Sequence, residues 1–221
     1  MRIGVLGTGM VGRTIGAKLV GLGHEVMLGS RTADNADATA WAAEVGDRAT
    51  HGTFADSAAF GEVLFNCTGG MVSLAALEAA GEDNIGDKVL VDVSNALDFS
   101  QGMPPRLAVA NTDSVGEQIQ RRFSSARVVK SLNTMNCAVM VDPAAVPGYH
   151  NVFVSGDDAD AKATVTDLLG QFGWPREAVI DLGDIKSARG AEALVLFWVF
   201  LRGALGGNQF NLGVVPPPAS P

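Results

Sequence analysis

A glycine triplet near the N-terminus constrains the fold of this chain more than any other feature of its sequence. Residues 3–6 form an apolar run typical of a buried strand, and Gly7, Gly9 and Gly12 follow it directly, before a helical pattern begins. In this context the first glycine permits a tight turn, the second lets a pyrophosphate approach the backbone, and the third lets the helix pack closely on the strand. The start of that helix offers unpaired N–H groups to phosphates. The sequence therefore predicts a dinucleotide site rather than an ordinary strand-to-helix turn.

Size, charge and cysteine usage exclude several classes of protein. The chain has 221 residues, 47% of them hydrophobic, which suits one large domain or one domain with a small lobe. A net charge of −8 gives no basic surface for nucleic acid. Cys67 and Cys137 lie far apart and the three histidines are scattered, so we expect no disulfide scaffold and no metal site. We expect a cytoplasmic protein that binds neither nucleic acid nor membrane.

Strand-like runs and helical patterns alternate along most of the chain. The predicted strands cover residues 3–6, 25–28, 48–51, 63–66, 88–93, 127–132, 151–155 and 178–182. The predicted helices lie at 12–22, 35–44, 55–60, 74–80, 113–123, 156–172 and 187–205. Such alternation predicts an α/β fold: a doubly wound, mostly parallel Rossmann sheet with a small C-terminal helical segment.

The segment after the second predicted strand indicates which nucleotide binds. Ser30 and Arg31 stand at the distance from Gly12 at which such folds place the residue that contacts the ribose. A carboxylate here would select NAD and repel a 2′-phosphate, whereas a hydroxyl and a guanidinium would bind that phosphate. The sequence therefore favours NADP, although the carboxylates of the nearby Asp34 and Asp37 count against this preference. The alternative is that Arg31 is a solvated residue at a helix start.

Small and polar residues follow three further predicted strands, where a doubly wound sheet forms its cofactor crevice. These residues are Cys67, Thr68, Gly69, Ser94, Asn95, Asn133, Thr134, Met135 and Asn136. The polar ones either hydrogen-bond the nicotinamide carboxamide and a hydride acceptor or cap the elements that follow. We expect both cysteines to be inert core residues.

Several motifs taken together resemble one family. They are Gly7-Thr8-Gly9-Met10-Val11-Gly12, Gly29-Ser30-Arg31, Lys130-Ser131-Leu132-Asn133-Thr134, Ser155-Gly156-Asp157-Asp158, and Leu182-Gly183 before Ser187-Ala188-Arg189 and an apolar helix. The set resembles the NADPH:F420 oxidoreductase family, which shares its nucleotide domain with ferric reductases of the STEAP type. The resemblance covers nearly the whole chain.

That resemblance implies hydride exchange between NADP(H) and the 5-deazaflavin F420 as co-substrate. It implies phosphate contacts at Thr8, Ser30 and Arg31, and an acceptor cleft lined by residues 134–136 and 205–207. The chain departs from the family's pattern at Asn35, near where a lysine is frequent, and at Asn136, where a proline is common. The predicted cofactor-binding residues are Gly7, Thr8, Gly9, Met10, Val11, Gly12, Ser30, Arg31, Cys67, Thr68, Gly69, Ser94, Asn95, Thr134, Met135, Asn136 and Leu205.

No side chain is predicted to be catalytic, because the cofactor carries the hydride and the protein has to align two rings. Lys130 and Asn133 could form a pair of the β-hydroxyacid dehydrogenase type, but they lie on a predicted strand rather than on a helix of a long C-terminal domain. We interpret Lys130 as a strand-end residue or as a contact for an acceptor phosphate. The alternative functions are NADP-dependent reduction of a flavin, ferric chelate, imine or carbonyl compound, and non-catalytic sensing of NADP.

The C-terminal segment completes the predicted organisation. We expect residues 1–184 to form the NADP-binding domain and residues 185–221 to complete the acceptor cleft or a homodimer interface, with Pro216–Pro218 in a disordered tail. Residues 193–201 are too few to span a bilayer and are expected to form a buried helix. Phe197, Trp198 and Phe200 are assigned to the core or to the dimer interface. Lys186, Arg189 and Arg202 either bind an anionic acceptor or form a solvated face.

Overall fold

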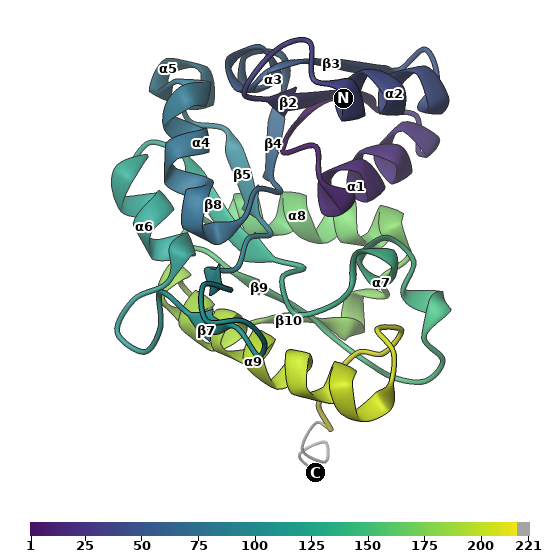
Figure 1. Cartoon of the computed structure of the whole chain (residues 1–221), viewed down its shortest axis with the longest axis vertical. Coiled ribbons are helices and arrows are strands. Elements are labelled where there is room, and N and C mark those ends of the chain that lie inside the picture. Colours follow the sequence, from purple (N-terminus) through teal and green to yellow (C-terminus); the bar gives the residue numbers. More distant parts are fainter. Residues whose placement is uncertain (216–221) are drawn as a thin grey trace.

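The computed structural model describes residues 1–215, so the tail predicted at Pro216–Pro218 lies outside the described residues. Within that range an eight-stranded sheet carries helices on both faces (Figure 1). The strands are β1 (Arg2–Leu6), β2 (Glu25–Ser30), β3 (Ala49–Thr53), β4 (Val63–Asn66), β5 (Val89–Asp92), β8 (Arg127–Ser131), β9 (Val152–Ser155) and β10 (Val179–Asp181), and a separate hairpin pairs β6 (Leu97–Asp98) with β7 (Arg106–Leu107). The helices are α1 (Met10–Gly21), α2 (Ala36–Val45), α3 (Phe54–Phe60), α4 (Ser73–Ala80), α5 (Glu82–Ile85), α6 (Val115–Arg122), α7 (Cys137–Val141), α8 (Ala159–Phe172) and α9 (Ala188–Leu205).

The order of the strands confirms the predicted doubly wound sheet. It runs β10-β9-β8-β5-β4-β1-β2-β3, and every neighbouring pair is parallel except β8 with β9. The chain builds outward from β1 through β2 and β3, then returns to β4 on the other side of β1. The loops that follow β1 and β4 therefore diverge, and the carboxyl ends of these strands border a crevice.

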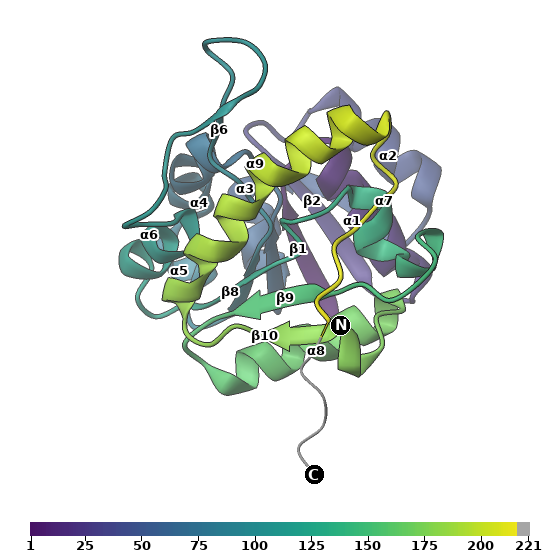
Figure 2. The ribbon, with the colours of Figure 1, turned by 90° about the horizontal axis from the view of Figure 1, so that it is seen from below.

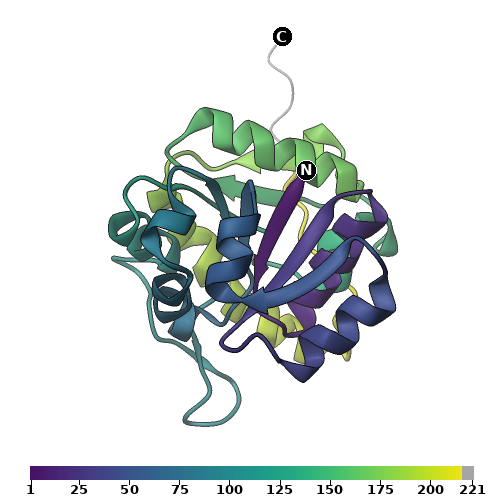
Figure 3. The same ribbon diagram turned by 90° about the horizontal axis from the view of Figure 1, so that it is seen from above.

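Each face of the sheet has its own hydrophobic core. On one face Leu19 of α1, Trp41 of α2 and Phe172 of α8 pack with the sheet. On the other face Leu77 of α4 and Phe123, just after α6, do the same. Figure 3 shows the purple strand β1 inside the fold, with blue and teal helices to one side of it and the purple α1 to the other. A parallel sheet covered on both faces requires the nearly unbroken apolar strands that the sequence contains.

The prediction that residues 193–201 form a buried helix is wrong in part, because one side of α9 is exposed. Val195 is buried, but Phe197 and Phe200 are 52% and 61% exposed. Figure 2 shows α9 running diagonally across the molecule in front of the sheet. A helix that lies across one side of a sheet contacts it along a single stripe, which leaves the opposite stripe uncovered even when its residues are apolar. The same view shows the loop between β6 and β7 projecting from the body of the protein.

Candidate functional site

The three glycines of the loop between β1 and α1 have different structural roles. Gly7 has a φ of +119°, a backbone conformation that favours glycine, and its N–H donates to the carbonyl of Gly29 at 2.9 Å. A Cβ on Gly12 would collide with the carbonyl of Gly7, so close packing of α1 requires a glycine there. A Cβ on Gly9 would meet no protein atom within 4 Å. The fold therefore needs Gly7 and Gly12, whereas no contact within the described residues requires a glycine at position 9, where the space is open.

The N-terminus of α1 directly follows the glycine loop and is open, like the N-termini of α4 and α9. No side chain caps it, and its first turn holds no acidic residue. By contrast, Asn35, Thr53, Ser114 and Asp158 each accept a hydrogen bond from the first turn of α2, α3, α6 and α8. The first N–H groups of α1 are thus left for an anion. An open cradle at Gly9 next to an uncapped helix fits the pyrophosphate of a dinucleotide.

The end of β2 places Ser30 and Arg31 beside this loop, because Leu6 of β1 pairs in register with Gly29. Arg31 is exposed and forms no ion pair with any residue of the described range, 1–215. The hydroxyl of Ser30 donates to the carbonyl of Thr32 and accepts from its N–H at 3.3 Å. Ser30 therefore shapes the turn, and the guanidinium of Arg31 is the group available to a 2′-phosphate. Asn35, where the family often has a lysine nearby, caps α2.

A cavity of about 320 Å³ lies at the carboxyl ends of β4, β5 and β8 and is bordered by α9; we call it the strand-end cleft. Its lining residues are Val11, Cys67, Thr68, Gly69, Val93, Ser94, Asn95, Leu97, Asn133, Met135, Met140, Val195 and Trp198. Seven of the predicted cofactor-binding residues are among them: Val11, Cys67, Thr68, Gly69, Ser94, Asn95 and Met135. The thirteen lining residues come from five separate segments that only the fold brings together.

Three residues predicted for the acceptor cleft, Thr134, Asn136 and Leu205, do not line this cavity. Thr134 is buried at 2% exposure. Asn136 caps α7 by accepting a hydrogen bond from the N–H of Ala138 at 3.0 Å. Leu205 is 62% exposed at the end of α9. Conversely, Trp198, which the sequence assigned to the core or a dimer interface, lines the cleft.

A buried polar network lies directly under the cleft. The amide of Asn66 donates to Asp92 at 2.8 Å, and the hydroxyl of Thr68 donates to the other side of Asn66 at 2.6 Å. Lys130 forms ion pairs with Asp92 and Glu192, both at 2.8 Å, and also donates to the carbonyl of Ser94. The network therefore fixes two loops that line the cleft, those that hold Thr68 and Ser94.

This network corrects the interpretation of Lys130 as a contact for an acceptor phosphate, because its side chain is completely buried. Burial by itself lowers the pKa of the Lys130 ammonium, but the carboxylates of Asp92 and Glu192 outweigh it, and the pKa lies above its usual value. Glu192 also accepts from the backbone N–H groups of Val115 and Gly116, at 2.9 and 3.1 Å. Sequence reasoning missed Glu192; its signal was a carboxylate beside the most apolar run of the chain.

The two cysteines lie in different surroundings: Cys137 is buried, as predicted, whereas Cys67 is half-buried and lines the strand-end cleft. Burial, reinforced by the charge of Asp92, raises the pKa of the Cys67 thiol, so Cys67 presents a neutral S–H to the cleft. Cys137 is buried and accepts from the hydroxyl of Thr14 at 3.7 Å. Within residues 1–215, no Lys, Arg or His side chain forms a hydrogen bond with either thiol.

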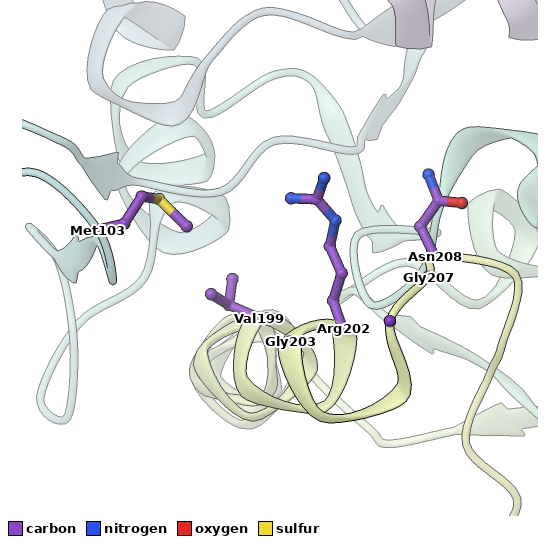
Figure 4. A pocket seen from close by; sticks show the side chains of 7 residues that line it. Met103, Val199, Arg202, Gly203, Gly207 and Asn208 are labelled. Carbon is purple, nitrogen blue, oxygen red and sulfur yellow. The ribbon is translucent and has the colours of Figure 1, made fainter.

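A second, more open cavity of about 490 Å³ lies along the C-terminal part of α9, and we call it the α9 cavity. It is lined by Met103, Val199, Arg202, Gly203, Gly206, Gly207 and Asn208. Figure 4 shows the side chains of Arg202 and Asn208 extending from α9 and the segment after it into the same space. Arg189 is held by two hydrogen bonds to Glu117, at 2.8 and 2.7 Å. Of the three cations predicted near this helix, only Arg202 lines a cavity beside α9.

Within residues 1–215, no group of three or more His, Cys, Asp or Glu side chains is arranged to hold a metal ion. In the same part of the chain, none of the helices is both long and apolar enough to cross a membrane.

Comparisons with known proteins agree on one reaction class. Residues 2–96 match the family described as NADP oxidoreductase, coenzyme F420-dependent. A crystal structure of a candidate F420-dependent NADP reductase from Arthrobacter sp. FB24 is 51% identical, with 98% of this chain and 100% of that one covered and a TM-score of 0.93. The metalloreductase STEAP3 of Rattus norvegicus is 28% identical over 202 residues, which are 88% of this chain and 36% of the rat protein. The chain therefore spans about a third of that curated relative.

The fold extends to more distant enzymes. The reductive aminase of Aspergillus terreus, solved with NADPH and ethyl levulinate, is 18% identical, with 93% of this chain and 62% of that one covered and a TM-score of 0.66. That likeness concerns the fold alone.

Proposed function

The chain belongs to the family of coenzyme F420-dependent NADP oxidoreductases, and we propose that it transfers a hydride between NADPH and the deazaflavin F420. Membership makes it an NADP-dependent oxidoreductase with a Rossmann sheet. Bound NADPH would supply a hydride. Oxidised F420 would take up that hydride together with one proton from solvent, which leaves NADP⁺ and reduced F420.

The observation that carries this proposal is the chemistry of the strand-end cleft. None of the described residues that line it is an Asp, Glu, His, Lys, Arg or Tyr, and the thiol of Cys67 is neutral. Reduction of an imine or a carbonyl compound needs a proton donor at the reacting atom. Transfer between two rings depends mainly on their alignment, and solvent can supply the proton that the reduced deazaflavin gains. The cleft supports the second reaction better than the first.

We assign the two ends of the nucleotide to different parts of the chain. The open space at Gly9 and the uncapped start of α1 bind the pyrophosphate, and Arg31 binds the 2′-phosphate. Cys67, Thr68, Gly69, Ser94 and Asn95 orient the nicotinamide in the cleft. The hydrogen bonds between Thr68, Asn66 and Asp92 hold one wall of that cleft still.

The α9 cavity supports an anionic acceptor such as F420, whose side chain carries a phosphate and carboxylates. Arg202 lines this cavity and forms no ion pair within residues 1–215, so its charge is available to an incoming anion. The neighbouring glycines, Gly203, Gly206 and Gly207, leave room along the helix end.

Anaerobic stopped-flow spectroscopy tests the proposal by following NADPH and F420 absorbance together. We expect turnover with F420 that exceeds turnover with free flavin, a ferric chelate or a cyclic imine. The variant Arg202→Met should raise the KM for F420 about tenfold and leave the KM for NADPH unchanged, because one charge-assisted hydrogen bond is lost. Lys186→Met, at an exposed cation before the same helix, is the control and should change neither value. Turnover with flavin but none with F420 would refute the proposed acceptor.

We also propose that α9 forms a homodimer interface. Phe197, Phe200 and Leu205 are 52%, 61% and 62% exposed on this helix, and burying such a stripe against a second copy removes apolar surface from water. Sedimentation velocity should show a dimer that Phe200→Asp converts to a monomer; a monomeric wild-type protein would contradict this.

The free thiols of Cys67 and Cys137 support the expected reducing, cytoplasmic compartment.

A further inference from the structure

Two polar groups of the strand-end cleft have no hydrogen-bond partner. Among residues 1–215, four buried side-chain polar atoms lack a partner, and two of these, the Ser94 hydroxyl and the Trp198 indole nitrogen, belong to residues that line this one cleft. Buried polar atoms are nearly always paired, because an unpaired one keeps the full cost of leaving water. Two of them in the same cleft indicate a ligand that pairs with both.

Trp198 is held in place although its N–H is unpaired. Its ring stacks on Phe210, with centroids 5.4 Å apart and planes 20° apart. Val195, one turn earlier on the same face of α9, also lines the cleft. The other two tryptophans are satisfied: Trp41 donates to the carbonyl of Arg13 at 3.1 Å, and Trp174 donates to that of Met140 at 2.9 Å. The missing partner is therefore specific to the tryptophan in the cleft.

The chemistry of the two groups defines what they recognise. An indole nitrogen only donates, so its partner must be an acceptor such as a carbonyl oxygen. A serine hydroxyl both donates and accepts, so it can take a hydrogen bond from an N–H beside that carbonyl. We propose that Ser94 and Trp198 together bind an amide edge, a carbonyl with an adjacent N–H, on the ring held in the strand-end cleft.

Two molecules of the proposed reaction carry such an edge, and the inference rests on the proposed function to this extent. One is NADP(H), through the carboxamide of its nicotinamide. The other is F420, through the pyrimidinedione of its deazaflavin. In either case Trp198 is a specificity-determining residue contributed by α9, outside the nucleotide-binding loops.

Binding measurements on Trp198→Phe test the inference, since phenylalanine keeps a ring against Phe210 and removes the N–H. Calorimetry gives the Kd of NADP⁺, of 2′-phospho-ADP-ribose, which lacks nicotinamide, and of oxidised F420 added to the NADP⁺-saturated enzyme. We expect a loss of about five- to tenfold for NADP⁺ or for F420, and none for 2′-phospho-ADP-ribose. Ser94→Ala should weaken the same ligand as Trp198→Phe does.

Trp174→Phe is the matched control, because it removes an indole N–H that already has a partner. It should leave all three Kd values unchanged and lower the Tm of the free protein by more than Trp198→Phe does. Unchanged affinity of Trp198→Phe for both NADP⁺ and F420 would overturn the inference. An equally large loss of affinity for 2′-phospho-ADP-ribose would also overturn it, as would a loss in Ser94→Ala that concerns a different ligand from the one affected in Trp198→Phe. If the wild-type protein binds no F420, the proposed function fails, and the NADP⁺ comparison alone then decides the role of Trp198.

Discussion

Removing the carboxylate of Glu192 should destabilise the protein severely, because this group joins α9 to the sheet. Glu192 is 3% exposed, pairs with the Lys130 ammonium at 2.8 Å, and accepts from the N–H groups of Val115 and Gly116. Loss of one partner of a buried ion pair costs about 3–5 kcal/mol. Two backbone donors are orphaned as well, but water can enter the space that a shorter side chain leaves. We therefore expect Glu192→Ala to lower the free energy of unfolding by about 3–5 kcal/mol.

Urea denaturation at pH 7, followed by circular dichroism, measures this loss. Glu78→Ala is the control, because Glu78 pairs with Arg122 through side chains that are 53% and 43% exposed. An exposed pair of this kind contributes about 1 kcal/mol or less. A loss for Glu192→Ala no larger than that for Glu78→Ala would refute the reasoning.

A double-mutant cycle with Lys130→Met separates the ion pair from the other contacts of Glu192. Lys130→Met alone leaves two buried carboxylates, those of Asp92 and Glu192, without their cation. Removing Glu192 in that background relieves part of the repulsion, so the double variant should lose at least about 1 kcal/mol less than the sum of the single losses. Additive losses would mean that the pair is not coupled.

Three further predictions concern the nucleotide site and the surface. Gly9→Ala should leave the Tm of the free protein unchanged, because the new Cβ meets no protein atom, but it should raise the Kd of NADP⁺ at least about tenfold in calorimetry. Gly12→Ala should instead lower the Tm, because its Cβ meets the carbonyl of Gly7. Arg31→Asp should weaken NADPH by about 2–3 kcal/mol more than NADH, and an equal loss for both would show that Arg31 does not bind the 2′-phosphate. Hydrogen bonding to Arg121 lowers the pKa of Asp113 from 3.8 to about 2, so Asp113 stabilises the fold above pH 4 and loses that effect as the pH falls towards 2. Asp113→Asn should therefore flatten this part of the acid-denaturation profile by about 0.5–1 kcal/mol, a value that allows for solvent screening; an unchanged profile would contradict it.

Local signals in the sequence sufficed for the strands and for the nucleotide loop. Apolar runs such as residues 63–66 lie in the middle of a sheet covered on both faces, where such a run has few alternatives to a strand. The need for a glycine at position 12 follows directly from the spacing of the glycine motif. The short helix α7 and the hairpin of β6 with β7 escaped prediction, because neither has an apolar period long enough to detect.

The contacts of Lys130 and Trp198 could not be predicted, for a different physical reason. Lys130 is buried because Glu192, 62 positions later in the chain, comes back to neutralise it. Trp198 faces the cleft rather than a partner subunit because α9 crosses the strand ends at one particular angle. Both depend on how a helix sits on a finished sheet, which no periodicity within the helix encodes.

The uncapped start of α1 makes the nucleotide part of the folding equilibrium. A helix whose first turn is completed only by a bound anion is more stable with its ligand than without it, and mass action sets the gain. At a nucleotide concentration one hundred times the Kd, that gain is about 2.7 kcal/mol. We therefore expect the nucleotide-free protein to unfold, and to be cleaved by proteases, more readily than the protein with its nucleotide bound.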